Sequence, residues 1–283
     1  MIQLCAFSDE YGNSLDQQIQ GLKKNGIRLM EIRNVDGVNI GKMPEEMAKD
    51  IAAKLAEAGI SVWSIGSPLG KVDIGTDFEE YKKQVRHVCR LANIFGAKRI
   101  RMFSFYNAFE LPELVVERLK EMVAIGAEYG VDMCHENEKK IYGDVISRVE
   151  YIRDNVPGLK FVYDPANFLQ CDQDCGKALD ALMDCTSYFH IKDVVSETQE
   201  MVPAGYGNGR IDDMLCRIQK DTVLTLEPHL AIFAGYSAID DTEMKHRFCF
   251  ESNEAAFDAA VNALKELLVK CGYRCENGNY IRG

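Results

Sequence analysis

Residues 132–140 read DMCHENEKK, and this stretch decides which fold the chain is expected to adopt. An apolar approach ends on His135, Glu136 and Asn137, and charged residues follow at once. The same kind of ending occurs three more times, in KFVYDPANF (160–168), YFHIKDV (188–194) and VLTLEPHL (223–230). Four apolar runs that each end on a potential metal ligand need a single structural explanation.

Eight short apolar runs of this kind divide the chain, and they predict eight β-strands. Most are nearly continuous, as in ISVWSI (60–65) and LKFVY (159–163). Such runs are typical of strands that are covered on both faces, as in a parallel sheet. The runs begin near residues 2, 27, 60, 98, 131, 159, 187 and 222.

Helix patterns separate the runs. In residues 14–26, Ser14 and Gln17 form a capping box and Gly26 marks the end of the helix. Strands that alternate with helices, over a length near the about 250 residues of a typical barrel, predict a single (β/α)8 TIM barrel domain over residues 1–283. A doubly wound open sheet is the alternative, but no early glycine-rich fingerprint supports it. Further helices are expected over 43–59, 77–96, 112–129, 144–155, 176–185, 212–219 and 253–271.

The composition narrows the class of partner. A formal net charge of −11 argues against nucleic acid, because binding to phosphates draws on clustered lysine and arginine. No apolar run approaches the about 20 residues that cross a bilayer, and the start of the chain lacks a signal-peptide pattern, so we expect a cytoplasmic protein without a membrane partner. Ten scattered cysteines are then expected to be reduced thiols. A small-molecule substrate is the starting hypothesis, and a homo-oligomer is left open.

In a parallel barrel the carboxyl ends of all strands converge on one face, where the active site lies. Strand five would deliver Glu136, strand six Asp164, strand seven His190 and strand eight Glu227. Each residue alone has another reading, as a helix N-cap, a rim salt bridge or a structural histidine. Three carboxylates held together would repel one another unless a cation neutralises them. Oxygen and nitrogen donors without thiolate suit one divalent metal ion, Mn²⁺, Co²⁺, Mg²⁺ or Zn²⁺.

These residues resemble the xylose-isomerase-like TIM barrels, a family of sugar phosphate isomerases and epimerases. The resemblance covers nearly the whole chain, in the motifs HENE, IYGD, YDPANF, FHIKD, PAGYGNGRID and LTLEPH. It implies that Glu136, Asp164, His190 and Glu227 are metal ligands. Together the motifs are specific for the superfamily and not for a substrate, because sugar 3-epimerases, aldose–ketose isomerases, keto-inositol dehydratases and endonuclease IV share this scaffold. A sugar or sugar derivative is the substrate that we expect.

One position departs from the family pattern. Many members have histidine three residues after the strand-six aspartate, where this chain has Asn167. An amide can bind a sugar hydroxyl but is a poor ligand for a second transition metal. A trinuclear zinc site of the endonuclease type is therefore not expected.

The resemblance also suggests a mechanism, in which Glu136 and Glu227 lie on opposite sides of the substrate. One would remove a proton next to the carbonyl and the other would return it, through an enediolate. Lys192 could reach a substrate oxygen, although a rim salt bridge with Asp193 or another nearby acid is an equal alternative.

Further candidate substrate contacts come from both halves of the chain. Asn137 could turn inward if its strand has ended, and His229 follows Glu227 by two residues. Trp63 could form part of an apolar wall for a sugar ring, with core packing as the alternative. Glu31 and the segment 8–10 are candidate polar groups of the pocket, and the long loop after residue 233 is a candidate binding loop.

Two other functions remain open. A lyase would dehydrate a keto-inositol or keto-sugar, with Lys192 or His229 as the acid that expels water. A barrel subunit without catalytic activity is the third reading, and the presence of all four candidate ligands argues against it.

Overall fold

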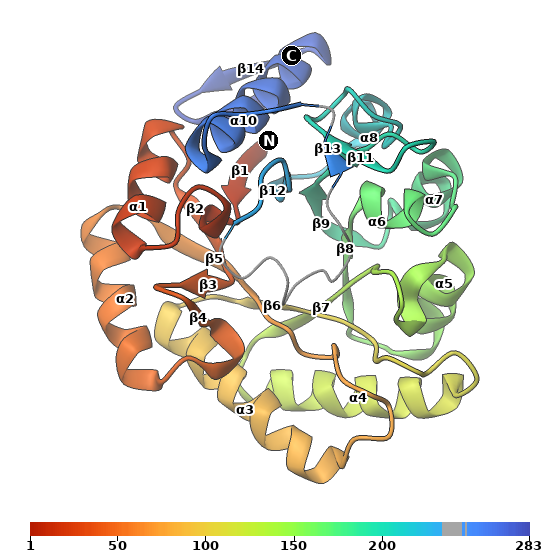
Figure 1. Cartoon of the computed structure of the whole chain (residues 1–283). Coiled ribbons are helices and arrows are strands. Elements are labelled where there is room, and N and C mark those ends of the chain that lie inside the picture. Colours follow the sequence, from red (N-terminus) through yellow and green to blue (C-terminus); the bar gives the residue numbers. More distant parts are fainter. Residues whose placement is uncertain (234–244, 247) are drawn as a thin grey trace.

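The computed structural model describes residues 1–233, 245, 246 and 248–283, and it is a TIM barrel (Figure 1). Eight parallel strands form the barrel, as the apolar runs predicted. The barrel strands are β1 (Ile2–Ala6), β2 (Leu29–Ile32), β5 (Ser61–Gly66), β6 (Arg99–Met102), β7 (Asp132–Glu136), β8 (Lys160–Tyr163), β9 (Thr186–Ile191) and β12 (Thr222–Leu226).

The barrel closes where its first strand meets its last. The order around the sheet is β12-β9-β8-β7-β6-β5-β2-β1, and β1 then pairs with β12 over its whole length, from Ile2 opposite Thr222 to Ala6 opposite Leu226. All of these pairings are parallel, so the carboxyl ends of the eight strands lie on one face.

Helices surround the strands in the order that the sequence predicts (Figure 1). Ser14 and Gln17 form the expected capping box of α1, and Gly96 ends α3 in the left-handed conformation that glycine adopts without strain. The helices are α1 (Leu15–Lys24), α2 (Glu45–Glu57), α3 (Phe78–Phe95), α4 (Pro112–Glu128), α5 (Ile146–Asn155), α6 (Pro165–Leu169), α7 (Cys175–Leu182), α8 (Ile211–Arg217) and α10 (Asn253–Lys270). Among the described residues, no helix is long and apolar enough to span a membrane.

Several short elements were not predicted. The five-residue helix α6 begins directly after Asp164. Small strands form a hairpin and a three-stranded sheet, and β14 (Tyr273–Glu276) and β15 (Asn279–Arg282) form a hairpin whose second strand pairs antiparallel with β1. The small strands are β3 (Asn34–Val35), β4 (Val38–Asn39), β10 (Asp193–Val194), β11 (Glu200–Val202) and β13 (Lys245–His246). Residues 234–244 and 247, which contain most of the candidate binding loop, lie outside the described residues.

The interior of the barrel has an apolar end. A group that we call the amino-end cluster is fully buried there, against the partly buried Leu29 and Trp63. Alternation along each strand sends every second side chain inward, so the next inward residue on the same strand points to the carboxyl end. The members of the amino-end cluster are Cys5, Cys134, Val162, Tyr188 and Val223.

Candidate metal centre

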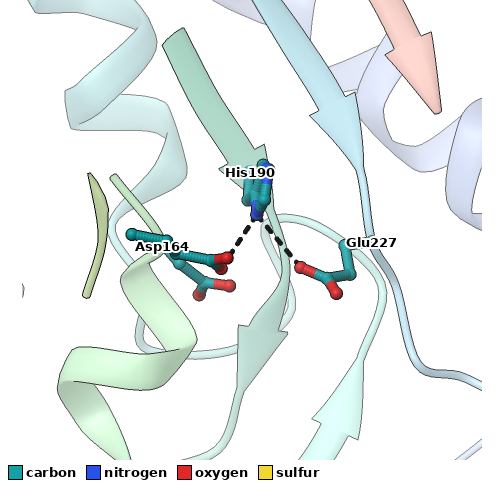
Figure 2. Close-up of side chains that lie close together, drawn as sticks. Asp164, His190 and Glu227 are labelled. Carbon is teal, nitrogen blue, oxygen red and sulfur yellow. Dashed lines mark hydrogen bonds and ion pairs between the residues drawn. The ribbon is translucent and has the colours of Figure 1, made fainter. Parts of the chain in front are cut away.

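The four candidate ligands meet at the carboxyl end of the barrel. Glu136 is the last residue of β7, Asp164 follows β8, His190 is near the end of β9 and Glu227 follows β12. Each offers one ligand atom, and these atoms all lie within 4.8 Å of one another. All four residues are buried, and Figure 2 shows Asp164, His190 and Glu227 pointing toward one another.

His190 lies at the centre of this group. Its Nδ1 atom is 2.9 Å from Glu136 Oε1 and 3.1 Å from Glu227 Oε2, and its Nε2 atom is 3.2 Å from Glu31 Oε2. Burial would lower the pKa of His190, but Glu136 and Glu31 outweigh burial and raise that pKa well above its usual value. In the metal-free protein the imidazolium form therefore balances part of the carboxylate charge.

Asp164 has two structural partners, one for each oxygen. Its Oδ1 atom accepts a hydrogen bond of 3.0 Å from the backbone N–H of Asn167 and thereby caps α6. Its Oδ2 atom is 2.8 Å from Lys192 Nζ. Burial, opposed by Lys192 and aided by Glu136 and Glu227, raises the pKa of Asp164 to about 7. From the sequence, a helix N-cap and a metal ligand were alternative roles for Asp164. In the structure its side chain caps α6 and also belongs to the group of candidate ligands.

A buried arginine holds each glutamate through the oxygen that faces away from His190. Arg101 Nε is 3.1 Å from Glu136 Oε2, and Arg33 Nη1 is 2.7 Å from Glu227 Oε1. Each carboxylate therefore presents its other oxygen to the metal centre.

Neither arginine was predicted from the sequence, although strand alternation carried a signal for each of them. Arg33 follows the candidate pocket residue Glu31 by two positions, and Arg101 lies between the apolar Ile100 and Met102 near the end of a predicted strand. Arg33 is also shared with Asp9, 2.9 Å from its Nε, and with Glu10, 3.2 Å from its Nη2.

The two asparagines tie the ends of β7 and β8 together. Asn137 Nδ2 donates to the carbonyl oxygen of Asp164 over 2.8 Å, and Asn137 Oδ1 accepts from the backbone N–H of Asp164 over 2.9 Å. Asn167 Nδ2 donates to the carbonyl oxygen of Asn137 over 2.9 Å and lies 3.4 Å from Glu136 Oε1. The Asn137 amide is thus occupied by the backbone of a candidate ligand, whereas Asn167 borders the cavity beside the candidate metal centre.

The ammonium group of Lys192 forms an ion pair with Asp164 and does not form the rim salt bridge with Asp193. Its Nζ atom lies 3.9 Å from Glu227 Oε2 as well as beside Asp164. Asp193 instead accepts hydrogen bonds from backbone N–H groups, including those of Gly205 and Gly207. The cavity at this point is lined by Lys71, Arg101, Phe103, Glu136, Glu138, Asn167, Lys192, Glu227 and His229.

His229 approaches the centre from the other side of Glu227. Its Nε2 atom is 3.5 Å from Glu227 Oε1, and its backbone N–H donates to Glu10 Oε2 over 2.8 Å. The φ angle of His229 is +46°, in the left-handed region that a residue with a side chain adopts only when its surroundings enforce it.

Trp63 is not part of this site, contrary to the prediction. Its ring packs against the amino-end cluster, with the ring centroid 6.3 Å from that of Tyr188 and the guanidinium of Arg99 3.8 Å from the ring centroid. Arg99 is the first residue of β6, so this contact lies at the opposite end of the barrel from the metal centre. The prediction failed because Trp63 comes early in its strand and therefore points into the amino end.

The residues present fit a divalent cation. Within the described part of the chain, Asp164 Oδ2 and Glu227 Oε2 are buried and have ion-pair contacts but no hydrogen bond of good geometry. Both oxygens face the centre, where a cation would satisfy them. Among the described residues, seven carboxylates around them face four permanent cations and the imidazolium of His190, which leaves an excess of two negative charges when all seven are ionised. A bound cation would reduce that excess. The carboxylates are Asp9, Glu10, Glu31, Glu136, Glu138, Asp164 and Glu227, and the cations are Arg33, Lys71, Arg101 and Lys192.

Comparison with known proteins gives one family. Residues 19–267 match the family described as xylose isomerase-like TIM barrel. No curated protein matches the chain.

Solved structures share the fold at low sequence identity. An L-ribulose 3-epimerase is 17% identical with a TM-score of 0.75, and the match covers 96% of this chain and 96% of that chain. The IOLI protein with a bound zinc atom is 17% identical with a TM-score of 0.73, covering 95% and 98% of the two chains. The probable 3-DHS dehydratase AsbF of Bacillus anthracis, involved in petrobactin synthesis, is 16% identical with a TM-score of 0.72, covering 94% and 99%.

Proposed function

The chain belongs to the xylose isomerase-like TIM barrel family, and we propose that it is a divalent-metal-dependent isomerase or epimerase of a sugar or sugar derivative. The observation that supports this proposal most is the placement of two buried glutamates from different strands, Glu136 and Glu227, on the same nitrogen of His190. Two carboxylates that converge on one point, each with a second oxygen held by an arginine, are suited to pass a proton to and from a substrate between them.

The ion would be held by Glu136, Asp164, His190 and Glu227. When bound, it would polarise a substrate carbonyl and acidify the adjacent carbon-bound proton. One glutamate removes that proton and the other returns it after an enediolate has formed. Return to the opposite face of the same carbon gives epimerisation, and transfer to the neighbouring carbon gives isomerisation.

The remaining candidate residues bind and orient the substrate. Lys192 donates hydrogen bonds to a developing oxyanion from its position beside Asp164 and Glu227. Asn167 and His229 border the same cavity and can bind sugar hydroxyls. Asn137 acts indirectly, because its amide holds the backbone of Asp164.

Deuterium incorporation tests the proton route. A proton held on a carboxylate can exchange with water before it returns, so turnover of a candidate ketose in D₂O should place deuterium at the carbon that changes. A hydride that passes directly between carbons carries no label from the solvent. An unlabelled product from a single turnover in D₂O would contradict the roles proposed for Glu136 and Glu227.

A dehydratase is the second candidate, because Lys192 and His229 both border the cavity and either could protonate a leaving hydroxyl. Elimination of water would give an unsaturated product that absorbs in the ultraviolet, whereas isomerisation or epimerisation would not. A small-molecule sugar as the partner, the absence of a nucleic-acid partner and a cytoplasmic location stay predictions.

A further inference from the structure

We propose that Glu31 is a positioning residue that determines which nitrogen of His190 faces the metal. This inference rests on the metal centre proposed above. Glu31 belongs to β2, is fully buried and is not one of the four residues that offer a ligand atom. Its carboxylate contacts Nε2 of His190, whereas Glu136 and Glu227 contact Nδ1 of the same ring.

Two hydroxyl groups donate to Glu31 and the ring of His190 faces it, and these contacts hold its carboxylate in place. The Tyr188 hydroxyl donates to Oε1 over 2.9 Å, and the Thr225 hydroxyl donates to Oε2 over 3.0 Å. His190 Nε2 lies 3.2 Å from Oε2. Tyr188 is two residues before His190 and Thr225 is two residues before Glu227, so the support for Glu31 comes from the strands that carry two candidate ligands.

An ionised carboxylate can only accept hydrogen bonds, so the nitrogen that faces Glu31 has to carry a hydrogen. Nε2 therefore keeps its hydrogen against Glu31 when a metal is bound. Nδ1 carries the second hydrogen of the imidazolium in the metal-free protein, and it is the nitrogen that would exchange this hydrogen for a metal held by the candidate ligands. Nδ1 is also the atom that faces Glu136 and Glu227. Glu31 thus does for His190 what a carboxylate behind a metal-bound histidine does in general, which is to fix the tautomer and the ring orientation.

The aromatic neighbours of His190 restrict rotation of its ring but do not choose between its nitrogens. The ring centroid of Phe7 is 5.2 Å away and that of Tyr188 is 5.6 Å away, both with edge-to-face geometry. A ring flipped by half a turn would have similar contacts with these two side chains. Within the described residues, the choice between Nδ1 and Nε2 is therefore assigned to Glu31.

The first experiment needs no substitution. The protein is labelled with ¹⁵N-histidine and loaded with ¹¹³Cd²⁺, and the one-bond coupling between cadmium and nitrogen is measured by NMR. We expect coupling to Nδ1 of His190 and a hydrogen on Nε2, with the signal assigned by its loss in His190→Gln. Coupling to Nε2 would overturn the role of Glu31 while leaving the metal site intact. Failure of the wild type to bind Cd²⁺, Mn²⁺ or Zn²⁺ would overturn the metal site and this inference together.

The second experiment uses substitutions and calorimetric titration with Mn²⁺. Glu31→Gln should weaken binding roughly 10–100-fold, as expected when the partner of a metal-bound histidine is lost. Glu31→Ala should weaken binding further, because it removes the acceptor that the amide oxygen of glutamine keeps. An affinity within twofold of the wild type for Glu31→Gln would contradict the proposal.

Two threonines of β12 provide a matched pair. Thr225→Val removes one donor to Glu31 and should weaken Mn²⁺ binding by a smaller factor than Glu31→Gln. Thr222→Val is the same substitution on the same strand, but Thr222 donates to the carbonyl oxygen of Ser187 over 3.2 Å at the amino end. Thr222→Val should leave the affinity unchanged, and equal losses in the two variants would assign the effect to the strand and not to Glu31.

Discussion

The two ends of the barrel interior are built on the same strands and have opposite chemistry. On β7, β8 and β9, a single step of the strand alternation separates each member of the amino-end cluster from a candidate ligand. The pairs are Cys134 and Glu136, Val162 and Asp164, and Tyr188 and His190.

The two ends of the barrel interior contribute to different properties of the protein. The amino-end cluster buries apolar side chains, which stabilises the fold. The carboxyl end gathers acids whose mutual repulsion opposes folding unless a cation is present. Stability and chemistry are therefore expected to be separable along β7 and β8, and substitutions at the paired positions of these strands should show it. On β9, Tyr188 also donates to Glu31 and links the two ends.

The largest effect is expected for the pair on β7. Glu136→Gln removes a proposed general base, so turnover should fall roughly 10²–10⁴-fold. Cys134→Ala, two residues earlier, should lower stability but keep kcat close to that of the wild type. Steady-state kinetics at saturating metal measures the first effect and urea unfolding the second. Equal loss of turnover in both variants would contradict the proposal that only the carboxyl end takes part in catalysis.

Removal of the metal should destabilise the protein. An ion that binds only the folded state stabilises it by about 2.7 kcal/mol at a concentration of 100 times Kd. Chelation should therefore lower the thermal midpoint, and Asp164→Ala should lose both tight metal binding and sensitivity to the chelator. Metal retained in a stoichiometric amount by that variant would remove Asp164 from the ligand set.

The pair on β8 separates packing from charge in the metal-free protein. Val162→Ala removes buried methyl groups from the amino-end cluster and should cost about 2 kcal/mol of unfolding free energy. Asp164→Asn keeps the shape of the side chain but removes a charge from a crowded acidic site, so it should cost less or should stabilise. Urea unfolding in the presence of a chelator at pH 8 checks the order of the two variants.

The contribution of Asp164 to the stability of the metal-free protein should fall as pH rises. The pKa of Asp164 is raised from 3.8 to about 7 in the folded state, so the folded state binds a proton more tightly than the unfolded state in that window. Stability from this group is present at low pH and is lost as pH rises through about 7. The raised pKa of His190 acts with the same sign at higher pH.

The test is the urea midpoint between pH 5 and pH 8, measured with and without metal. Protons compete with a metal for the carboxylates and the imidazole, so stabilisation by the metal should grow with pH. Relative to Asp164→Asn, the midpoint of the chelated wild type should decrease over this range, because the variant lacks the titrating carboxyl. The same slope in the chelated and the metal-loaded protein would contradict the prediction.

The smallest effect is expected at Trp63, which is the only tryptophan of the chain. Because Trp63 packs at the amino end, Trp63→Phe should leave kcat and KM within about twofold of the wild type. The fluorescence of Trp63 should likewise stay unchanged when metal or sugar binds and change when the protein unfolds. A large spectral shift on metal binding would show that the two ends are coupled.

Strand ends were the most predictable part of this molecule. Glu136, Asp164, His190 and Glu227 could be identified because each stands where an apolar run stops, and the order of strands and helices then brings them together. The helix boundaries also followed from local signals, such as the capping box of α1.

The support around the ligands was less predictable, because it depends on partners far apart in the sequence. The contact of Arg33 with Glu227 joins residues 194 positions apart, and that of Tyr188 with Glu31 joins residues 157 apart. Glu31 was a candidate polar group of the pocket, but the sequence contained no sign that its carboxylate would contact Nε2 of His190. Trp63 failed for a simpler reason, because residue type alone does not tell which end of a strand faces the substrate.

The pairing of β1 with β12 has a consequence for how the chain is made. Ile2 can pair with Thr222 only after Thr222 has been synthesised, so the barrel cannot close until more than two hundred further residues have left the ribosome. At about 5–20 residues per second, synthesis of that intervening chain takes on the order of tens of seconds. Meanwhile β1 has β2 on one side and an unpaired edge on the other, which is the type of edge that associates with other chains. The nascent barrel is therefore most exposed to misassembly at this seam, far from its metal centre.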